Sequence, residues 1–253
     1  MPPALKQSRR WFRYAISFAF ASILALGLIW IIDAILHSEE RRQREFALQA
    51  TDSIREQIAK VNTAKAGWIH VGVPYHSEQS KIEANIFLDQ MNDVDPASTF
   101  ALDVEWLSGT DEFLAQLRNL EGLHRLLLLR CEITVKGMES IAAIPNLDSL
   151  NIYQSIITDR EIEALKSAPV LTTLSLAPFN ESDLTIPAIL TLPHLRNLTL
   201  YDFPAKWFAP QLNELKRGTM LKELTLVYVD PATIEPLRAA LPDRIITAKP
   251  DDR

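Results

Sequence analysis

The sequence predicts an α/β protein in which short strand-and-helix units stack into a solenoid, with one curved parallel β-sheet and short helices on its outer side. A transmembrane helix is expected to precede this solenoid. Two observations predict this fold class: leucines recur about every 24 residues from residue 99 onward, and residues 15–32 carry no charge. The 253 residues leave room for an N-terminal segment and one domain with its own core.

The N-terminal segment is the first element that the sequence predicts. Residues 15–32 form an uncharged run of 18 residues, which as a helix would be about 27 Å long and close to the thickness of the bilayer hydrocarbon core. Trp11, Tyr14 and Trp30 lie near its two ends, where aromatic side chains favour the membrane interface. We therefore expect a transmembrane helix over residues 15–36 that binds the chain to a membrane.

The charges beside this run predict its orientation. Lys6, Arg9, Arg10 and Arg13 precede it, whereas the nearest charged residue after it is Asp33. Basic residues favour the cytoplasmic side, so we expect a basic cytoplasmic N-terminus over residues 1–14, a single-pass membrane location, and a repeat domain outside the cytoplasm. A cleaved signal peptide and a buried soluble helix are the alternatives.

The composition excludes several classes of function. The net charge is −6, and the first 45 residues are basic, so the rest of the chain is strongly acidic and a poor match for nucleic acid. Cys131 is the single cysteine, which excludes an intrachain disulfide and a zinc site built from cysteines. We expect Cys131 to pack in the core as a small apolar side chain.

The repeats give the strongest signal in the sequence. The pattern L-x-x-L-x-L begins at Leu123 and returns at Leu147, Leu171, Leu195 and Leu221, with steps of 24, 24, 24 and 26 residues. An earlier unit beginning at Thr99 fits the same frame, and a last strand is expected near residues 244–247. Because side chains alternate along a strand, positions 4 and 6 of each pattern should face the core and positions 3, 5 and 7 the opposite face.

The second half of each unit predicts a short helix. Apolar residues recur there every three residues, and Pro145, Pro169 and Pro193 follow at the point where three of these helices should end. Thr158 and Asp159 stand where an N-cap is wanted. A single strand-and-helix unit cannot bury its apolar side, so the units are expected to stack.

Residues 147–170, LDSLNIYQSIITDREIEALKSAPV, resemble the leucine-rich-repeat family in its 24-residue form, of the ribonuclease-inhibitor-like and bacterial membrane-anchored type. The resemblance covers residues 99–248 and implies a leucine-rich-repeat solenoid. The chain departs from the family pattern at position 9, where the usual asparagine or cysteine appears only as Cys131. We expect Phe179 and Phe203, at that position in later units, to stack as an apolar spine.

Residues 37–98 are predicted to form a juxtamembrane helix and an N-terminal cap of the leucine-rich-repeat domain, and residues 249–253 a polar tail. A helix over residues 39–66 presents one apolar face, which we expect to cover the open end of the repeats, although a short coiled-coil dimer is the alternative. This face comprises Ala47, Ala50, Ile54, Ile58 and Val61. Trp68 to Val73 should form a strand beside the first repeat strand, and residues 79–92 a helix.

The sequence offers little chemistry. His70, His76 and Glu78 form the single plausible ligand cluster, but their spacing matches no metal motif that we recognise, and surface histidines are the expected outcome. Motifs for a nucleophile elbow, a phosphate-binding loop or a dinucleotide site do not occur. We therefore predict no catalytic residue, no metal ligand and no cofactor, and a protein that is not an enzyme.

The concave face of the predicted sheet is the candidate binding surface, because aromatic and arginine side chains gather there and such residues are frequent in binding hot spots. The residues concerned are Trp106, Leu129, Arg130, Tyr153, Tyr201, Asp202 and Tyr228. They predict a membrane-anchored module that binds a protein or peptide. A structural or assembly subunit of an envelope complex is the alternative, and a metal-dependent enzyme is a remote one. The plainer interpretation is that these side chains simply cover a sheet.

Overall fold

The fold is described here from a computed structural model of the full chain. Its backbone is described over residues 4–72, 77–177, 184–203, 214–215, 220–229 and 231–249. The side chains of residues 4–27 and of a few scattered positions lie outside this description. The chain divides into two compact units, Met1–Gln49 and Ala50–Arg253, and the second contains the sheet.

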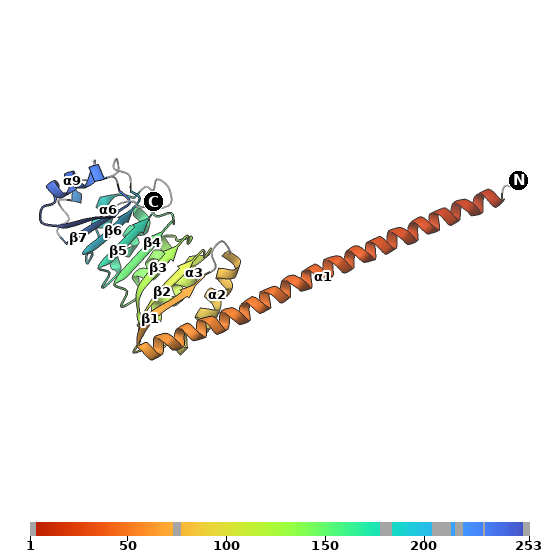
Figure 1. The fold of residues 1–253 in the computed structure, drawn as a ribbon, viewed down its shortest axis with the longest axis horizontal. Helices are drawn as coiled ribbons and strands as arrows, with labels where there is room; N and C mark the ends of the chain where they lie inside the picture. The colour runs from red at the N-terminus through yellow and green to blue at the C-terminus, as the bar shows by residue number, and fades with distance from the viewer. Residues whose placement is uncertain are drawn as a thin grey trace. The chain divides into compact units, whose positions relative to one another are not determined.

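One sheet of eight parallel strands organises the second unit, and the strands lie side by side in chain order (Figure 1). They are β1 (Ala66–Val71), β2 (Thr99–Glu105), β3 (Leu123–Leu129), β4 (Ser149–Tyr153), β5 (Thr173–Ala177), β6 (Asn197–Tyr201), β7 (Glu223–Val227) and β8 (Ile245–Lys249). The predicted α/β class and the predicted parallel sheet are thus confirmed. The assignment to the leucine-rich-repeat family stays a prediction.

The recurring leucines set the register of this sheet. Leu126 pairs with Leu150, Leu150 with Leu174, and Leu174 with Leu198, so residues 24 positions apart lie beside one another. Each of these four side chains is at most 1% exposed. The next alternate position, Leu128 in β3 and Ile152 in β4, is equally buried. A continuous apolar layer therefore runs along one face of the sheet, as the alternation of the sequence predicts.

Short helices alternate with the strands and pack against one another in chain order. The described helices are one long helix, α1 (Ala4–Ala64), and the shorter helices α2 (Ser77–Gln90), α3 (Thr110–Gln116), α4 (Val135–Ala142), α5 (Asp159–Ala164), α6 (Ile186–Leu190) and α9 (Pro231–Ala240). The 3-10 turns are η1 (Met91–Asp93), η2 (Leu117–Asn119) and η3 (Leu165–Ser167). These helices supply the second apolar layer, which includes Met138, Ile141 and Ile162.

Threonine hydroxyls begin three of these helices. Thr158 accepts a hydrogen bond from the backbone of α5 and forms a capping box with Glu161, as a helix N-cap should. Asp159, which the sequence suggested as part of this cap, instead accepts hydrogen bonds from the backbone N–H of Thr185 (2.7 Å) and from its hydroxyl (2.9 Å). Thr185 caps α6, so this carboxylate ties the start of one helix to the start of the next.

The membrane prediction is contradicted. We expected a transmembrane helix over residues 15–36, a single-pass membrane location and a cytoplasmic N-terminus. The structure forms one helix, α1, through this segment, but no helix in the described part of the chain is long and apolar enough to cross a membrane. We therefore do not retain the membrane assignment.

The C-terminal part of α1, from Ala50 onward, and strand β1 pack as part of the second unit. Ala50, Ile54, Ile58 and Val61, on one face of α1, are at most 4% exposed, so this part of the predicted apolar face is buried. Ala47, the fifth residue of the predicted face, is only half-buried and belongs to the first unit. Strand β1 pairs with β2, as predicted, and extends the sheet by one strand before the first repeat. Its register places β1 residues opposite β2 residues 33 positions later, a spacing outside the 24-residue frame.

Two residues after the end of these strands, the chain carries an apolar or small side chain that faces the core. Cys131 and Phe203 are each 4% exposed, and Phe179 lies outside the described residues. The backbone N–H of Cys131 donates to the hydroxyl of Ser155 at 3.1 Å, so a side-chain hydrogen bond links the chain just after β3 to the chain just after β4.

Cys131 is expected to be unreactive in the folded chain. Burial raises the pKa of its thiol to about 11, which leaves about a hundredfold less thiolate near neutral pH than an ordinary cysteine has. Modification by a water-soluble thiol reagent should therefore be at least about 100 times slower in buffer than in 8 M urea. Equal rates in the two solvents would show that the thiol is accessible in the native state.

Candidate functional site

The side chains at alternate strand positions, opposite the buried leucine layer, form a face that we call the exposed face. Its described side chains are mostly half-buried, with Ser175 and Val227 more deeply covered. Strand register arranges them in two rows. One row contains Asp103, Leu127, Asn151, Ser175, Thr199 and Thr225; the other contains Glu105, Leu129, Tyr153, Ala177, Tyr201 and Val227.

Tyr153 and Tyr201 meet on this face although they come from strands that are not neighbours. Strand β5 lies between β4 and β6, so the backbones at these residues should be about 10 Å apart. The residue of β5 in this row is Ala177, whose small side chain leaves room above it. The two rings approach to 5.3 Å between centroids in an edge-to-face arrangement that is favourable for aromatic pairs.

Tyr228 continues this aromatic group at the end of β7. Its ring lies 6.4 Å from that of Tyr201, and the residue is 38% exposed. We call Tyr153, Tyr201 and Tyr228 the tyrosine cluster. Burial raises the pKa of the Tyr153 hydroxyl far above its usual value, and the neighbouring Tyr201 hydroxyl adds to the effect. Tyr153 therefore keeps a neutral phenol group over the whole physiological pH range.

A row of residues directly after the strands borders the exposed face. Trp106, Arg130, Gln154, Asp202 and Tyr228 all have positive φ, between 50° and 59°. The N–H of Trp106 donates to the carbonyl of Leu129, and that of Arg130 to the carbonyl of Tyr153, each at 2.9 Å. The hydrogen-bond ladder between strands thus holds non-glycine residues in a left-handed conformation that costs about 1 kcal/mol each.

The predicted binding residues fall into two groups. Trp106 and Arg130 stack, with the guanidinium carbon 4.3 Å from the indole centroid, and Arg130 also donates a hydrogen bond to Gln154. The tyrosine cluster forms the second group. Leu129 lies in the row between Glu105 and Tyr153, so it connects the two groups. Asp202 is exposed beside the tyrosine cluster and makes further interactions of its own.

The sequence was compared with protein-family models and with curated proteins. Neither comparison gives a match. The resemblance to leucine-rich repeats therefore remains a prediction from the residues.

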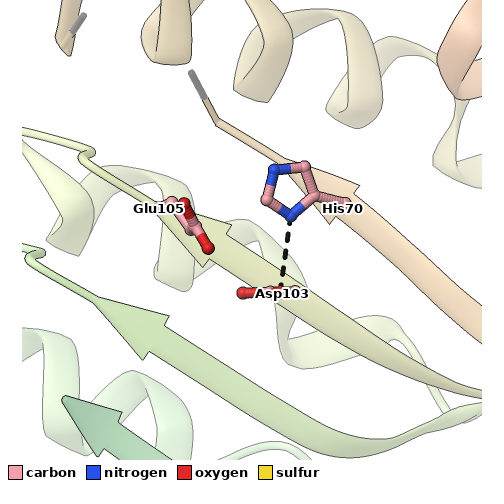
Figure 2. A group of neighbouring side chains, drawn as sticks. All are labelled: His70, Asp103 and Glu105. Atoms are coloured by element: carbon pink, nitrogen blue, oxygen red, sulfur yellow. Dashed lines mark ion pairs between the residues drawn. The ribbon is translucent and has the colours of Figure 1, made fainter. Parts of the chain in front are cut away.

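A second group of side chains lies at the N-terminal end of this face. His70 of β1 is opposite Asp103 of β2, and Glu105 follows two residues later on the same strand. Figure 2 shows the three side chains on the same side of the two neighbouring strands. Each offers one ligand atom, and these three atoms lie within 4.8 Å of one another. We call His70, Asp103 and Glu105 the histidine–carboxylate cluster.

Backbone contacts fix this cluster in place. The amide N–H of His70 donates to Gln57 of α1 at 2.7 Å, and that of Gly72 donates to Glu83 of α2 at the same distance. Gly72 has a φ of 137° and passes so close to β2 that an added Cβ would lie 2.3 Å from the carbonyl oxygen of Glu105. A glycine is therefore required where β1 leaves the sheet.

The electrostatics of the cluster are those of two carboxylates beside one imidazole. The hydrogen bond to Asp103 raises the pKa of His70, although burial opposes this change. Burial raises the pKa of Glu105, and the negative charge of Asp103 raises it further. Asp103 Oδ1 is buried and has no hydrogen-bond partner among the described residues. Negative charge is therefore concentrated here with incomplete compensation.

The candidate ligand cluster weighed in the sequence, which comprises His70, His76 and Glu78, is not assembled by the described residues. Glu78 is exposed, and its carboxylate pairs with Lys81 at 3.0 Å, while His76 lies outside the described residues. Sequence reasoning missed Asp103 and Glu105 as neighbours of His70. Aligning the predicted strand at residues 68–73 with the strand predicted from Thr99 onward would have brought them together, because Asp103 and Glu105 are positions 5 and 7 of that pattern and so share one face.

Proposed function

We propose that this protein binds a protein or peptide segment across the exposed face of its sheet, and that its role is recognition and not catalysis. One observation carries the proposal: Tyr153, Tyr201 and Tyr228 form a continuous, partly exposed aromatic group that no apolar layer of the described chain covers. Tyrosine is among the residues most enriched in binding hot spots, because its ring is large and its hydroxyl can hydrogen-bond.

The packing of the tyrosine cluster supports binding for an energetic reason. Tyr153 and Tyr201 already hold each other in one arrangement, so little side-chain entropy remains to be lost when a partner docks. The stacked pair of Trp106 and Arg130 is similarly ordered before binding. The strands from β2 to β7 span about 24 Å, which suits one extended segment or one helix of a partner.

The experiment compares four purified forms of this chain for the proteins that each one captures from an extract of the source cells. Wild type is compared with the double variant Tyr153→Ala/Tyr201→Ala, with Tyr153→Phe/Tyr201→Phe, and with Ile156→Ala. Ile156 is 70% exposed and lies outside the sheet strands, so it controls for the loss of an exposed apolar side chain. The captured protein is then purified, and its affinity for each chain is measured directly.

We expect the double alanine variant to bind the purified partner at least about 100-fold more weakly, because two hot-spot tyrosines together contribute about 3 kcal/mol or more. The phenylalanine variant should keep most of the affinity if ring packing dominates, and Ile156→Ala should match wild type. A folded double alanine variant with wild-type affinity would exclude the exposed face as the binding surface. It would favour an assembly role that uses another surface.

A further inference from the structure

We propose that His70, Asp103 and Glu105 form a binding site for a divalent transition-metal ion, at the N-terminal end of the exposed face. This site is separate from the tyrosine cluster, and the proposal does not depend on the binding function of that cluster. Three observations carry it: the spacing of the ligand atoms, the orientation of the imidazole, and a buried carboxylate oxygen without a partner.

The spacing of the ligand atoms is compatible with shared ligation of one ion. His70 Nδ1 and Asp103 Oδ2 are 3.4 Å apart, which is long for a charge-assisted hydrogen bond, whose length is about 2.8 Å. Two ligands about 2.0–2.1 Å from one tetrahedral ion are about 3.3 Å from each other. The ligand atom of Glu105 is within 4.8 Å of the other two, so a rotation of this flexible side chain is enough to complete the set.

The imidazole is oriented by a backbone carbonyl. His70 Nε2 lies 3.1 Å from the carbonyl oxygen of Gly72, and a carbonyl can only accept, so Nε2 carries the proton. In the neutral ring the lone pair is then on Nδ1, which points at Asp103 (Figure 2). A histidine that donates one ring N–H to a carbonyl and directs the other nitrogen at an ion is the usual arrangement in metal sites.

The two carboxylates of the cluster also favour a bound cation. Asp103 Oδ1 is buried without a hydrogen-bond partner in the described structure, which is costly for a carboxylate oxygen. Asp103 and Glu105 are on the same face of one strand, two residues apart, so their charges repel each other. A dication would neutralise both carboxylates, and Asp103 Oδ1, which lacks a hydrogen-bond partner among the described residues, would serve as one of its ligands.

The donor set determines which ions are suitable. One imidazole and two carboxylates are borderline-to-hard ligands that suit Zn²⁺, Mn²⁺ or Fe²⁺, while soft ions such as Cu⁺ prefer the sulfur ligands that this site lacks. Three protein ligands leave at least one coordination position for water or for a side chain of a bound partner. The ends of β1 and β2 hold all three ligands, so the site should be formed in advance of binding.

Titration calorimetry with Zn²⁺ on the tag-free, chelator-treated full chain tests the proposal, with the visible absorption of Co²⁺ as a second readout. We expect one Zn²⁺ per chain and a weakening of at least about 10-fold in both Asp103→Asn and Glu105→Gln, as loss of a ligand requires.

The sheet offers a matched control. His124 Nδ1 in β3 and Asp148 Oδ2 just before β4 are 3.3 Å apart, but among the described residues no third ligand lies beside them. Asp148→Asn should therefore leave the Zn²⁺ affinity within about twofold of wild type. Absence of saturable Zn²⁺ binding, wild-type affinity in folded Glu105→Gln, or equal weakening by Asp148→Asn would each overturn the proposal. Loss of Zn²⁺ binding with retained partner capture would leave the tyrosine cluster as an independent surface.

Discussion

Replacing Leu150 with alanine is expected to lower the free energy of unfolding by roughly 3–4 kcal/mol. Leu150 is fully buried in β4, where Leu126 and Leu174 of the neighbouring strands lie beside it. Both neighbours are fixed by backbone hydrogen bonds of the ladder, so the sheet cannot move inward to fill the cavity, and the loss should be at the higher end for such a change. Urea denaturation followed by far-UV circular dichroism measures the difference.

Ile156→Ala is the control for this measurement. Ile156 is 70% exposed, so its truncation should change the free energy of unfolding by no more than about 0.5 kcal/mol. A decrease in the free energy of unfolding of less than about 1 kcal/mol for Leu150→Ala would mean that the buried leucine layer does not form the core of the sheet. The strand register would then be wrong.

Gly72→Ala is expected to lower the free energy of unfolding by roughly 2–3 kcal/mol. The backbone at Gly72 has a φ of 137°, which residues with a side chain rarely adopt, and the new methyl group would lie 2.3 Å from the Glu105 carbonyl oxygen. A backbone atom cannot rotate away, so the end of β1 must separate from β2. The change in unfolding midpoint with an unchanged urea dependence would report this loss.

Gly109→Ala separates the two causes of that loss. Gly109 also has a positive φ, 70°, but an added Cβ would meet nothing within 4 Å. Its substitution should therefore cost only the conformational penalty of about 1 kcal/mol. Equal losses in the two variants would show that the close contact between Gly72 and β2 does not contribute to stability.

Much of the fold could be predicted from the sequence, because the same apolar pattern returns every 24 residues and each copy must lie beside the next to bury its leucines. The left-handed conformation of Trp106 and Arg130 could not be predicted, since neither residue favours it. It is imposed by hydrogen bonds to the neighbouring strand, which depend on the assembled sheet. The membrane-spanning helix was predicted from an uncharged run, and the described helices do not support it.

The candidate sites show the same division. The tyrosines were predicted as part of one face, but their contact depends on the small size of Ala177 in the strand between them. The histidine–carboxylate cluster was missed because β1 does not follow the 24-residue frame and because α2 lies between β1 and β2 in the chain. Only the pairing of these two strands brings His70 to Asp103.

The chain order of the strands has a consequence for folding. Each of the strands β2 to β7 pairs with the strands directly before and after it in the chain, so each new pairing closes a loop of similar, short length. The entropy lost on loop closure grows with loop length, and it therefore stays nearly constant from one strand to the next. Folding can begin at any adjacent pair and spread outward, and transient opening should start at β1 or β8, each of which pairs with one strand only.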